Sequence, residues 1–231
     1  MTIKHGDFVT IEYVGKVNGK IFDLTDEALA KKENVYREHV KYGPVTIIVG
    51  RSQLIRGIDK ALEGKKEGET FDIEIQPEDG FGKKSSKLIK IVPASSFKSQ
   101  KINPMPGMQI NVDGLIGNII SASSGRVIID FNHPLAGKVL NYNVTVKKII
   151  ADKKHMIASV FDIYAGIASE NLDIKEDSKK LTVHYKSKAQ LHEQLREVII
   201  SDIKKYIGFE EVDLKEEIIK SQKDSESKTN K

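Results

Sequence analysis

Apolar and polar residues alternate in short runs along the first 80 residues, a pattern typical of β-strands. One run covers residues 9–13, and the Asn18-Gly19 pair that follows it is a signal for a tight hairpin. Further short strands are predicted over residues 45–49 and 71–75. The alternation therefore predicts that this part of the chain forms a sheet.

Two helices are predicted among these strands. The first covers the charged, weakly amphipathic stretch 28–42, which begins after acidic residues suited to a helix start. The second begins at Ser52 as its cap and ends at Gly64. Its apolar residues fall on one stripe: Leu54, Ile55, Ile58, Ala61 and Leu62.

After Gly82 the pattern changes to short apolar runs separated by prolines and by Gly-containing turns. This stretch predicts a small all-β unit, because four such runs occur within 50 residues. Alternation over residues 140–146 then predicts a strand that returns to the first sheet. A unit that leaves and re-enters a host domain in this way is an insertion, which surface loops tolerate well.

The last third of the chain predicts an α+β domain. Ser187 is expected to cap a strong amphipathic helix that ends at Gly208, with strands before and after it. The apolar stripe of this helix can form the core of its own domain or a dimer face, and we favour the core. The expected division is a discontinuous host domain, an inserted β domain, a C-terminal α+β domain and a disordered tail, over residues 1–85 plus 132–152, 86–131, 153–220 and 221–231 respectively.

Composition places the chain among ordinary globular proteins, with 231 residues, 30% of them charged and 39% hydrophobic. We expect no contact with a membrane, because no apolar run approaches the roughly 18 residues that a span requires. The polar start lacks a secretory signal, and the absence of cysteine fits a reducing compartment, so a cytoplasmic location is expected. Residues 83–131 carry seven basic and two acidic residues, which predicts either a solvated surface or a region that meets acidic partners.

The sequence offers no cofactor site. It has no glycine-rich phosphate loop, and its six histidines lack the spacing of metal ligands. No Ser-His-Asp order stands out, and paired acids such as Glu210-Glu211 lie in charge-rich segments where solvation is the default. We therefore expect neither a metal nor any other cofactor.

Five short segments, which cover residues 11–13, 21–23, 54–58, 78–82 and 132–142, together indicate one apolar pocket with a single acid. Taken in order, these segments resemble the FKBP-type peptidyl-prolyl isomerases, and most closely the SlyD-like branch that carries a chaperone insert. The most specific is the string Asp130–Lys138, where the insert of that branch rejoins its host. Residues after Asp152 resemble, more loosely, the extra domain of long-chain archaeal members. The metal-binding tail of SlyD-like proteins has no counterpart here, since residues 221–231 contain neither His nor Cys.

The resemblance implies an α+β fold in which an antiparallel sheet wraps on a short helix, and a pocket that holds a prolyl side chain. Asp23 would be the acid at the pocket edge, although from the residues alone it is as well explained as a turn residue. The family often has Trp where this chain has Ile58 and Tyr where it has Phe81, which predicts weaker binding of macrolide inhibitors. The residues expected at the catalytic site are Tyr13, Phe22, Asp23, Leu54, Ile55, Ile58, Phe81, Leu135 and Tyr142.

The resemblance also implies that the insert captures unfolded chains, so the expected partners are unfolded or proline-containing polypeptides. Some apolar residues of the insert must form its own core, yet methionine-rich surfaces adapt to many partners. The alternative function is a non-catalytic holdase with the same fold. Nucleic acid is not an expected partner, because aromatic residues for stacking are scarce. A homodimer, if one forms, is expected to use the C-terminal domain. The residues expected to bind clients are Met105, Met108, Leu115, Ile116, Ile119 and Ile120.

Overall fold

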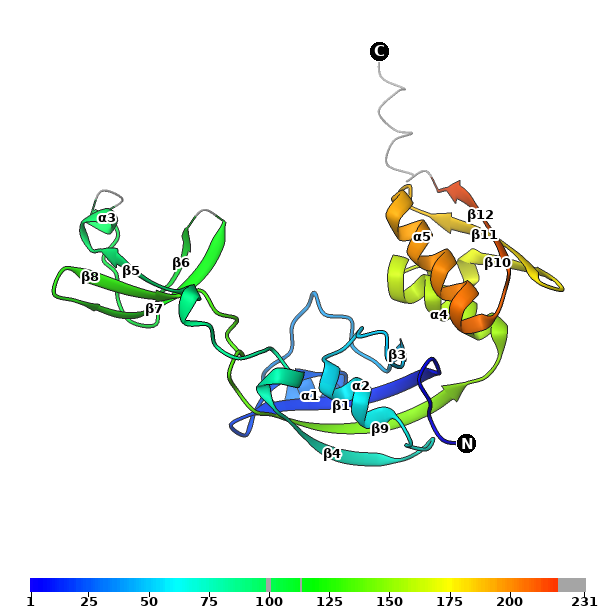
Figure 1. Ribbon diagram of the computed structural model, residues 1–231, viewed down its shortest axis with the longest axis horizontal. Helices are drawn as coiled ribbons and strands as arrows, with labels where there is room; N and C mark the ends of the chain where they lie inside the picture. Colours follow the sequence, from blue (N-terminus) through cyan, green and yellow to red (C-terminus); the bar gives the residue numbers. More distant parts are fainter. Residues whose placement is uncertain (99–100, 113, 220–231) are drawn as a thin grey trace, which may run out of the picture.

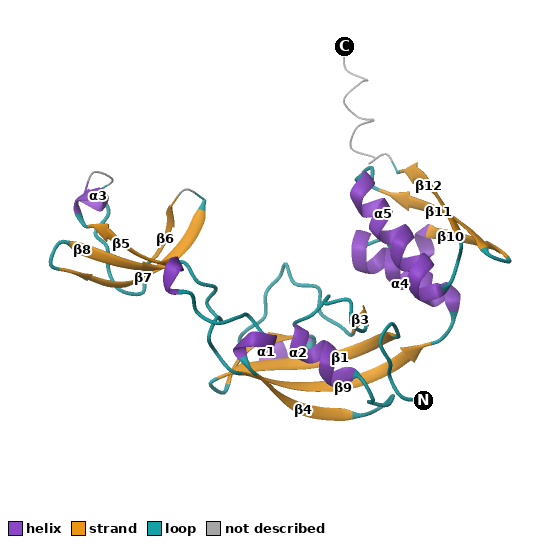
Figure 2. Ribbon diagram, viewed as in Figure 1, coloured by secondary structure: helices purple, strands orange, loops and turns teal. Residues whose placement is uncertain are grey.

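The computed structural model describes residues 1–98, 101–112 and 114–219 and shows an α+β protein, as the sequence predicted. Its strands form three separate sheets, and each sheet has its own cluster of buried apolar side chains (Figures 1 and 2). The first sheet lies between the other two in the view of Figure 1. The predicted division into domains follows the same three sheets, but its boundaries stay a prediction, and the predicted tail lies outside the described residues.

The first sheet is antiparallel, with strand order β2-β1-β9-β4, and β3 pairs with β1. Helix α2 (Arg56–Leu62) buries Ile58 and Leu62 against this sheet. A Cβ atom at Gly57 would lie 2.5 Å from the Ile75 side chain, so only glycine allows the helix to approach the sheet this closely. The strands are β1 (Phe8–Val17), β2 (Lys20–Leu24), β3 (Val45–Ile48), β4 (Thr70–Ile75) and β9 (Leu140–Ile150).

The local signals in this region were only partly correct. The hairpin is confirmed, because Asn18 and Gly19 both have positive φ angles, 48° and 76°, as a tight turn between β1 and β2 requires. The predicted helix over 28–42 is wrong for most of its length. Helix α1 covers only Glu27–Lys32, with Asp26 as its cap, and buries a single residue, Ala30. A stretch with so little apolar surface to bury gains too little from packing to remain helical.

The second sheet has strand order β5-β8-β7-β6 and is built from the region called the insert here, residues 86–131. Its strands match the four apolar runs of the sequence, and α3 (Ser95–Lys98) supplies Phe97 to its core. Two chain segments lead to and from the first sheet, and the insert stands apart from it in Figure 1. The strands are β5 (Ile89–Pro93), β6 (Gln109–Val112), β7 (Leu115–Ser123) and β8 (Arg126–Asp130), and a 3-10 turn covers Ser86–Leu88.

The third sheet, with strand order β10-β11-β12, packs against two helices and forms what is called the C-terminal unit here, residues 153–219. Its core also contains Phe8 and Ile48 from the first sheet, so the two parts pack directly against each other. The elements are α4 (Lys153–Ala165), β10 (Leu172–Asp177), β11 (Lys180–Ser187), α5 (Glu193–Asp202) with a π-helical turn (Ile203–Ile207), and β12 (Glu211–Ile218), with a 3-10 turn over Ser169–Asn171.

The predicted cap of the long C-terminal helix is wrong. Ser187 lies at the end of β11, where it pairs with β12, and its hydroxyl donates a hydrogen bond to Glu216 at 2.9 Å. The helix begins at Glu193, after His192. Its predicted end is confirmed, because Gly208 follows the π-helical turn with φ 90°. The apolar stripe lies in the core, as favoured, with Ile199 and Ile203 fully buried.

Candidate active site

A cavity of about 310 Å³ opens between β1, β2, β9, α2, the loop before α2 and the loop after β4. Apart from one acid and one amide, its lining is aromatic and aliphatic. Seven of the nine residues that the sequence predicted for a catalytic site line it. The lining residues are Tyr13, Asp23, Gln53, Leu54, Ile55, Ile58, Phe81 and Tyr142.

Aromatic rings form one side of the cavity. The Tyr13 and Tyr142 rings meet edge to face with centroids 5.7 Å apart. Phe22 does not line the cavity but supports it from behind, because its ring contacts Tyr142 at 5.7 Å and Phe81 at 6.3 Å, again edge to face. Such edge-to-face pairs stabilise each other by roughly 0.5–1.5 kcal/mol beyond their buried area. The rings therefore form a connected wall.

The sheet fixes the tyrosine side of this wall. Tyr13 lies on β1 and Tyr142 on the neighbouring strand β9, where its partner across the strands is Gly15. A Cβ atom at Gly15 would lie 2.7 Å from the Tyr142 ring, so the ring can lie across β1 only because that position is glycine. Ile58 of α2 is fully buried and forms the floor.

Asp23 is the only carboxylate among the residues that line the cavity. It lies half-buried near the end of β2. Burial raises the pKa of its carboxyl above the ordinary value, while hydrogen bonds from the Tyr13 hydroxyl and the Leu24 main chain, and the charge of Arg37, act to lower it. Burial also raises the pKa of Tyr13 and of Tyr142, with the nearby Asp23 charge adding to the shift, so both hydroxyls stay protonated and can donate hydrogen bonds.

Phe81 reaches the cavity from the loop after β4, which begins with the 3-10 turn Pro77–Asp79. The Asp79 carboxylate holds this loop to α2, because it accepts two hydrogen bonds from Lys60 at 2.8 and 2.9 Å. On its other face the Phe81 ring stacks on His133, with centroids 4.4 Å apart and planes within 4°. His133 was not predicted, and no local pattern marks a ring that stacks on a residue 52 positions away.

The loop between β3 and α2 contributes Gln53, Leu54 and Ile55. The predicted helix cap at Ser52 is wrong: Ser52 has φ 56°, and α2 begins only after Ile55. The Ser52 N–H instead donates to the buried Asp59 carboxylate at 2.7 Å. The main-chain N–H of Ile55 donates no hydrogen bond within the part of the chain that the structure describes, so this donor is free to bind a ligand.

Leu135 is the one predicted residue that the structure does not bring to this wall. It lies half-buried in the segment 132–138 and is not among the lining residues. Gln53 is a lining residue that sequence analysis missed, because a single glutamine in a loop carries no signal. Within the described residues there is no cluster of His, Cys, Asp and Glu that could hold a metal ion, and no helix is long and apolar enough to cross a membrane.

The six residues predicted to bind clients divide into two groups. Ile116 and Ile120 are 66% and 49% exposed, and Leu115 and Met105 are exposed as well. Ile119 is only 1% exposed, in the core of the insert, and Met108 packs against that core. The prediction that Ile119 is available to a client is therefore wrong, because its side of β7 faces Val127 and Ile129.

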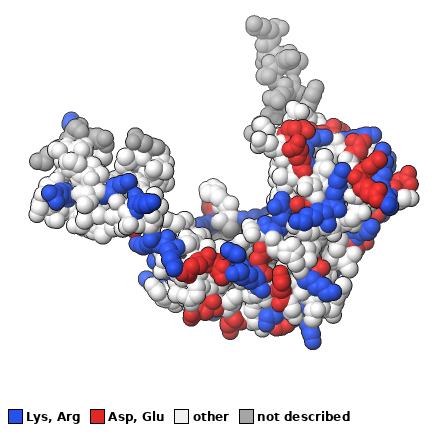
Figure 3. Space-filling model, in the orientation of Figure 1, with Lys and Arg blue, Asp and Glu red and all other residues white. Residues whose placement is uncertain are grey.

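A groove of about 610 Å³ crosses the insert, and Leu115 and Met108 contribute to its lining together with Leu88, Val112 and Phe131. On the face of the molecule shown in Figure 3, the insert carries basic side chains and no visible acidic ones, whereas acidic side chains gather on the two other parts. The insert therefore combines an apolar groove with a basic surface.

The comparisons with known proteins agree with this geometry. A family model described as FKBP-type peptidyl-prolyl cis-trans isomerase matches residues 1–99, and one described as FKBP26, IF domain, matches residues 90–135. The short-type peptidyl-prolyl cis-trans isomerase of Methanocaldococcus jannaschii is 36% identical over 147 residues, which cover 64% of this chain and 94% of the relative. The FKBP-type isomerase SlyD of Haemophilus influenzae is 31% identical over 151 residues, covering 63% and 72%.

Proposed function

This chain belongs to the FKBP-type peptidyl-prolyl cis-trans isomerase family and is thus an isomerase. We propose that it catalyses rotation about X-Pro bonds in the cavity lined by Tyr13, Asp23 and Tyr142. The observation that carries this proposal is a largely apolar cavity with one half-buried acid and with no serine, threonine, cysteine, lysine or histidine among its lining residues. Covalent catalysis requires an activated nucleophile, whereas rotation about a peptide bond requires none.

An apolar cavity can lower the barrier to this rotation. Amide resonance gives a barrier of about 18–20 kcal/mol, and water stabilises the polar planar ground state more than the twisted, less polar transition state. A site that holds the proline ring away from water therefore favours the twisted state. Uncatalysed isomerisation takes tens to hundreds of seconds, which is slow enough to limit folding of a client.

The lining residues would divide this task. Ile58 and the aromatic wall would hold the proline ring, and the free N–H of Ile55 would bind a substrate carbonyl oxygen. Asp23 would act at the edge of the cavity, where its interaction with Tyr13 keeps the carboxylate oriented. Leu135 would contact only a longer substrate, because it lies outside the cavity.

The test is turnover of a short proline peptide by the full chain and by two variants. Asp23→Ala should lower kcat/KM about ten-fold, which corresponds to about 1.4 kcal/mol, the scale of one hydrogen bond to a charged group. Asp72→Ala serves as the control, because it removes an exposed acid of the same sheet. The proposal fails if the wild-type chain shows no turnover, or if both variants are equally active.

We further propose that the insert binds unfolded polypeptides. In its favour are the exposed side chains of Leu115, Ile116 and Ile120, of which Leu115 also lines the apolar groove. Large apolar side chains that remain exposed on one small unit are typical of an interaction surface. A client held there would have a raised effective concentration at the isomerase cavity of the same chain.

A holdase function that does not use the cavity is the second candidate, because the exposed apolar residues of the insert lie outside the cavity lining. A chain that suppresses aggregation of an unfolded protein without accelerating proline-limited refolding would support it. Nucleic acid is disfavoured as a partner, because the insert has few aromatic residues for stacking, and Phe97 and Phe131 pack in or against its core.

We place the protein in the cytoplasm, which the complete absence of cysteine supports. Homodimerisation through the C-terminal unit stays a prediction. Because the apolar stripe of α5 is used within the unit, such a dimer would need another surface. Light scattering over a series of protein concentrations measures whether the protein is a monomer or a dimer.

A further inference from the structure

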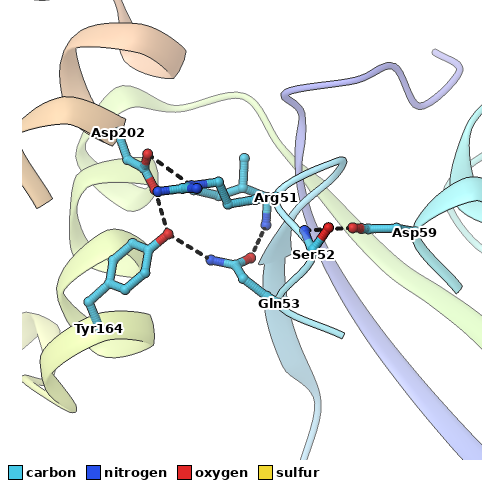
Figure 4. A network of polar contacts seen from close by, with 7 residues as sticks. Arg51, Ser52, Gln53, Asp59, Tyr164 and Asp202 are labelled. Carbon is cyan, nitrogen blue, oxygen red and sulfur yellow. Dashed lines mark hydrogen bonds and ion pairs between the residues drawn. The ribbon is translucent and has the colours of Figure 1, made fainter. Parts of the chain in front are cut away.

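A polar network joins the C-terminal unit to the loop that carries part of the cavity wall (Figure 4). The Arg51 Nε group donates hydrogen bonds to both carboxylate oxygens of Asp202, at 3.1 and 3.0 Å. The Tyr164 hydroxyl donates to the same carboxylate, and Gln53 Nε2 donates to the Tyr164 oxygen at 3.3 Å. Two residues of the β3–α2 loop thus contact α4 and α5.

Gln53 belongs both to this network and to the cavity. Its side chain lines the cavity wall beside Leu54 and Ile55. Its Oε1 atom accepts a hydrogen bond from the Ile48 N–H at 2.7 Å, while its amide nitrogen reaches Tyr164. A single side chain therefore connects the end of β3, the cavity wall and the C-terminal unit.

The β3–α2 loop adopts a conformation that needs support. Gly50 and Ser52 both have positive φ angles, 83° and 56°, and this region is uncommon for a residue other than glycine. On one side, the buried Asp59 carboxylate accepts hydrogen bonds from the Gly50 and Ser52 N–H groups at 3.2 and 2.7 Å. On the other side, Asp202 and Tyr164 hold Arg51 and Gln53, so the loop is held from both sides.

The first sheet and the C-terminal unit also share a direct apolar contact, in addition to the polar network. Phe8 and Ile48 of the first sheet are fully buried in the core of the C-terminal unit. Asp202 is 2% exposed at the edge of this contact, and a buried carboxylate is stable only when hydrogen-bonded and paired. The buried Asp202 carboxylate of the C-terminal unit therefore holds the Arg51 guanidinium, although 38% of the Arg51 side chain is exposed.

We propose that the C-terminal unit positions the substrate-binding loop of the isomerase, with Asp202 and Tyr164 as positioning residues that act through Arg51 and Gln53. They would fix Leu54 and the N–H of Ile55 in the place where a substrate main chain binds. This inference rests on the proposed function, in which the Ile55 N–H holds a substrate carbonyl oxygen. It makes the C-terminal unit part of the machinery that determines affinity for proline-containing chains.

Loss of the network should affect substrate binding more than the rotation step, because the β3–α2 loop is proposed to bind the substrate main chain. A released loop must be ordered each time a substrate binds, and this ordering weakens binding. Rotation about the X-Pro bond would occur against the aromatic rings of Tyr13, Phe81 and Tyr142, and the hydrogen bonds of the network join other residues. Loss of the network should therefore raise KM and leave kcat nearly unchanged.

The experiment uses the full chain with single substitutions that preserve shape. Tyr164→Phe removes the hydroxyl and Asp202→Asn removes the charge. Each should raise KM for a short proline peptide about three- to ten-fold, as expected for the loss of one or two hydrogen bonds, with kcat within about two-fold of wild type. The double variant should resemble the more severe single variant, because both residues belong to one network.

Conservative and control variants separate positioning from general stability. Arg51→Lys keeps the charge and should retain more activity than Arg51→Ala. Asp162→Asn removes the exposed ion pair with Lys41, which also joins the C-terminal unit to the first part of the chain, and should leave KM unchanged. Hydrogen exchange provides a readout without substrate: the Gly50 and Ser52 amides should exchange faster in Asp202→Asn and in Tyr164→Phe.

The proposal is overturned if folded Tyr164→Phe has wild-type KM and wild-type exchange at these amides, or if activity falls only in proportion to the unfolded fraction. Tyr164→Phe decides the matter if Asp202→Asn fails to fold. Failure of the proposed function looks different, since the wild-type chain would then be inactive or Asp23→Ala fully active.

Discussion

The Asn132 side chain hydrogen-bonds to both main-chain polar groups of Ser85. Its Oδ1 atom accepts from the Ser85 N–H at 2.8 Å, and its Nδ2 atom donates to the Ser85 carbonyl oxygen at 3.0 Å and to Asp130 at 2.7 Å. Ser85 lies where the chain leaves the first sheet and Asn132 where it returns. One buried amide thus joins the two segments that lead to and from the insert.

Replacement of Asn132 should therefore loosen the base of the insert. Asn132→Ala leaves the Ser85 main-chain groups without these partners and should lower the free energy of unfolding by about 1–3 kcal/mol, measured by urea denaturation. Asn141→Ala, at an exposed position on β9, is the matched control and should lie within about 0.5 kcal/mol of wild type. Equal stability of the two variants would contradict the role assigned to Asn132.

The raised pKa of Asp23 predicts how stability depends on pH. Because the folded-state pKa lies above the ordinary value of 3.8, the folded state binds the Asp23 proton more readily than the unfolded state does. The contribution of Asp23 to stability is therefore fully present below pH 3.8 and is lost as pH rises through the folded-state pKa. As pH rises through the folded-state pKa of Asp23, the free energy of unfolding of Asp23→Asn should increase relative to that of wild type. This difference should persist up to pH 7.

Denaturant unfolding of both proteins at a series of pH values measures this difference, and effects of the other carboxylates cancel in it. If the advantage of Asp23→Asn over wild type instead grows as pH falls, the hydrogen bonds to the Asp23 carboxylate stabilise its charged form by more than burial destabilises it.

Neighbouring isoleucines of β7 should have opposite roles. Ile116→Ser and Ile120→Ser change exposed side chains and should cost less than about 0.5 kcal/mol of stability. Both should weaken suppression of the aggregation of an unfolded protein. Ile119→Ala, in the core, should instead cost about 2–5 kcal/mol. If the exposed-site variants suppress aggregation as well as wild type does, clients bind elsewhere.

Regular patterns in the sequence predicted the fold where one local signal decides the structure. The Asn18-Gly19 turn, the alternating strands and the four apolar runs of the insert all correspond to observed elements. The helix starts at Ser52 and Ser187 were wrong because a residue suited to capping can be used elsewhere. Ser52 is held in a left-handed turn by Asp59, and Ser187 continues a strand that pairs with β12.

The candidate site was predictable to the extent that its residues resemble those of a family. Tyr13, Asp23 and Tyr142 come together in the cavity as expected. The link between Gln53, Tyr164 and Asp202 was not predictable, because it joins Gln53 to residues more than 100 positions further along the chain, and none of the three carries a local signal. The burial of Phe8 in the core of the C-terminal unit was also not predicted, because an alternating strand does not reveal which partner covers each of its faces.

Removal of the insert should separate the two proposed activities. Ser85 and Asn132 already lie within hydrogen-bonding distance, so a short glycine-containing linker can replace residues 86–130 without moving the ends of the first sheet. Every residue that lines the isomerase cavity lies outside the removed segment. Turnover of a short proline peptide should therefore stay within about two-fold of wild type.

Catalysis of the refolding of an unfolded protein should fall at least about ten-fold in the same variant, because tethering two binding sites raises the overall affinity for a client by roughly 10²–10⁴. The full chain with Ile116→Ser and Ile120→Ser is the control, since it should lose part of the refolding activity while the insert remains in place. Circular dichroism and thermal unfolding establish that the shortened chain is folded. If the shortened chain is folded yet turns over the short peptide as poorly as it refolds the protein, the insert contributes to the cavity itself, and the proposed separation of the two activities is wrong.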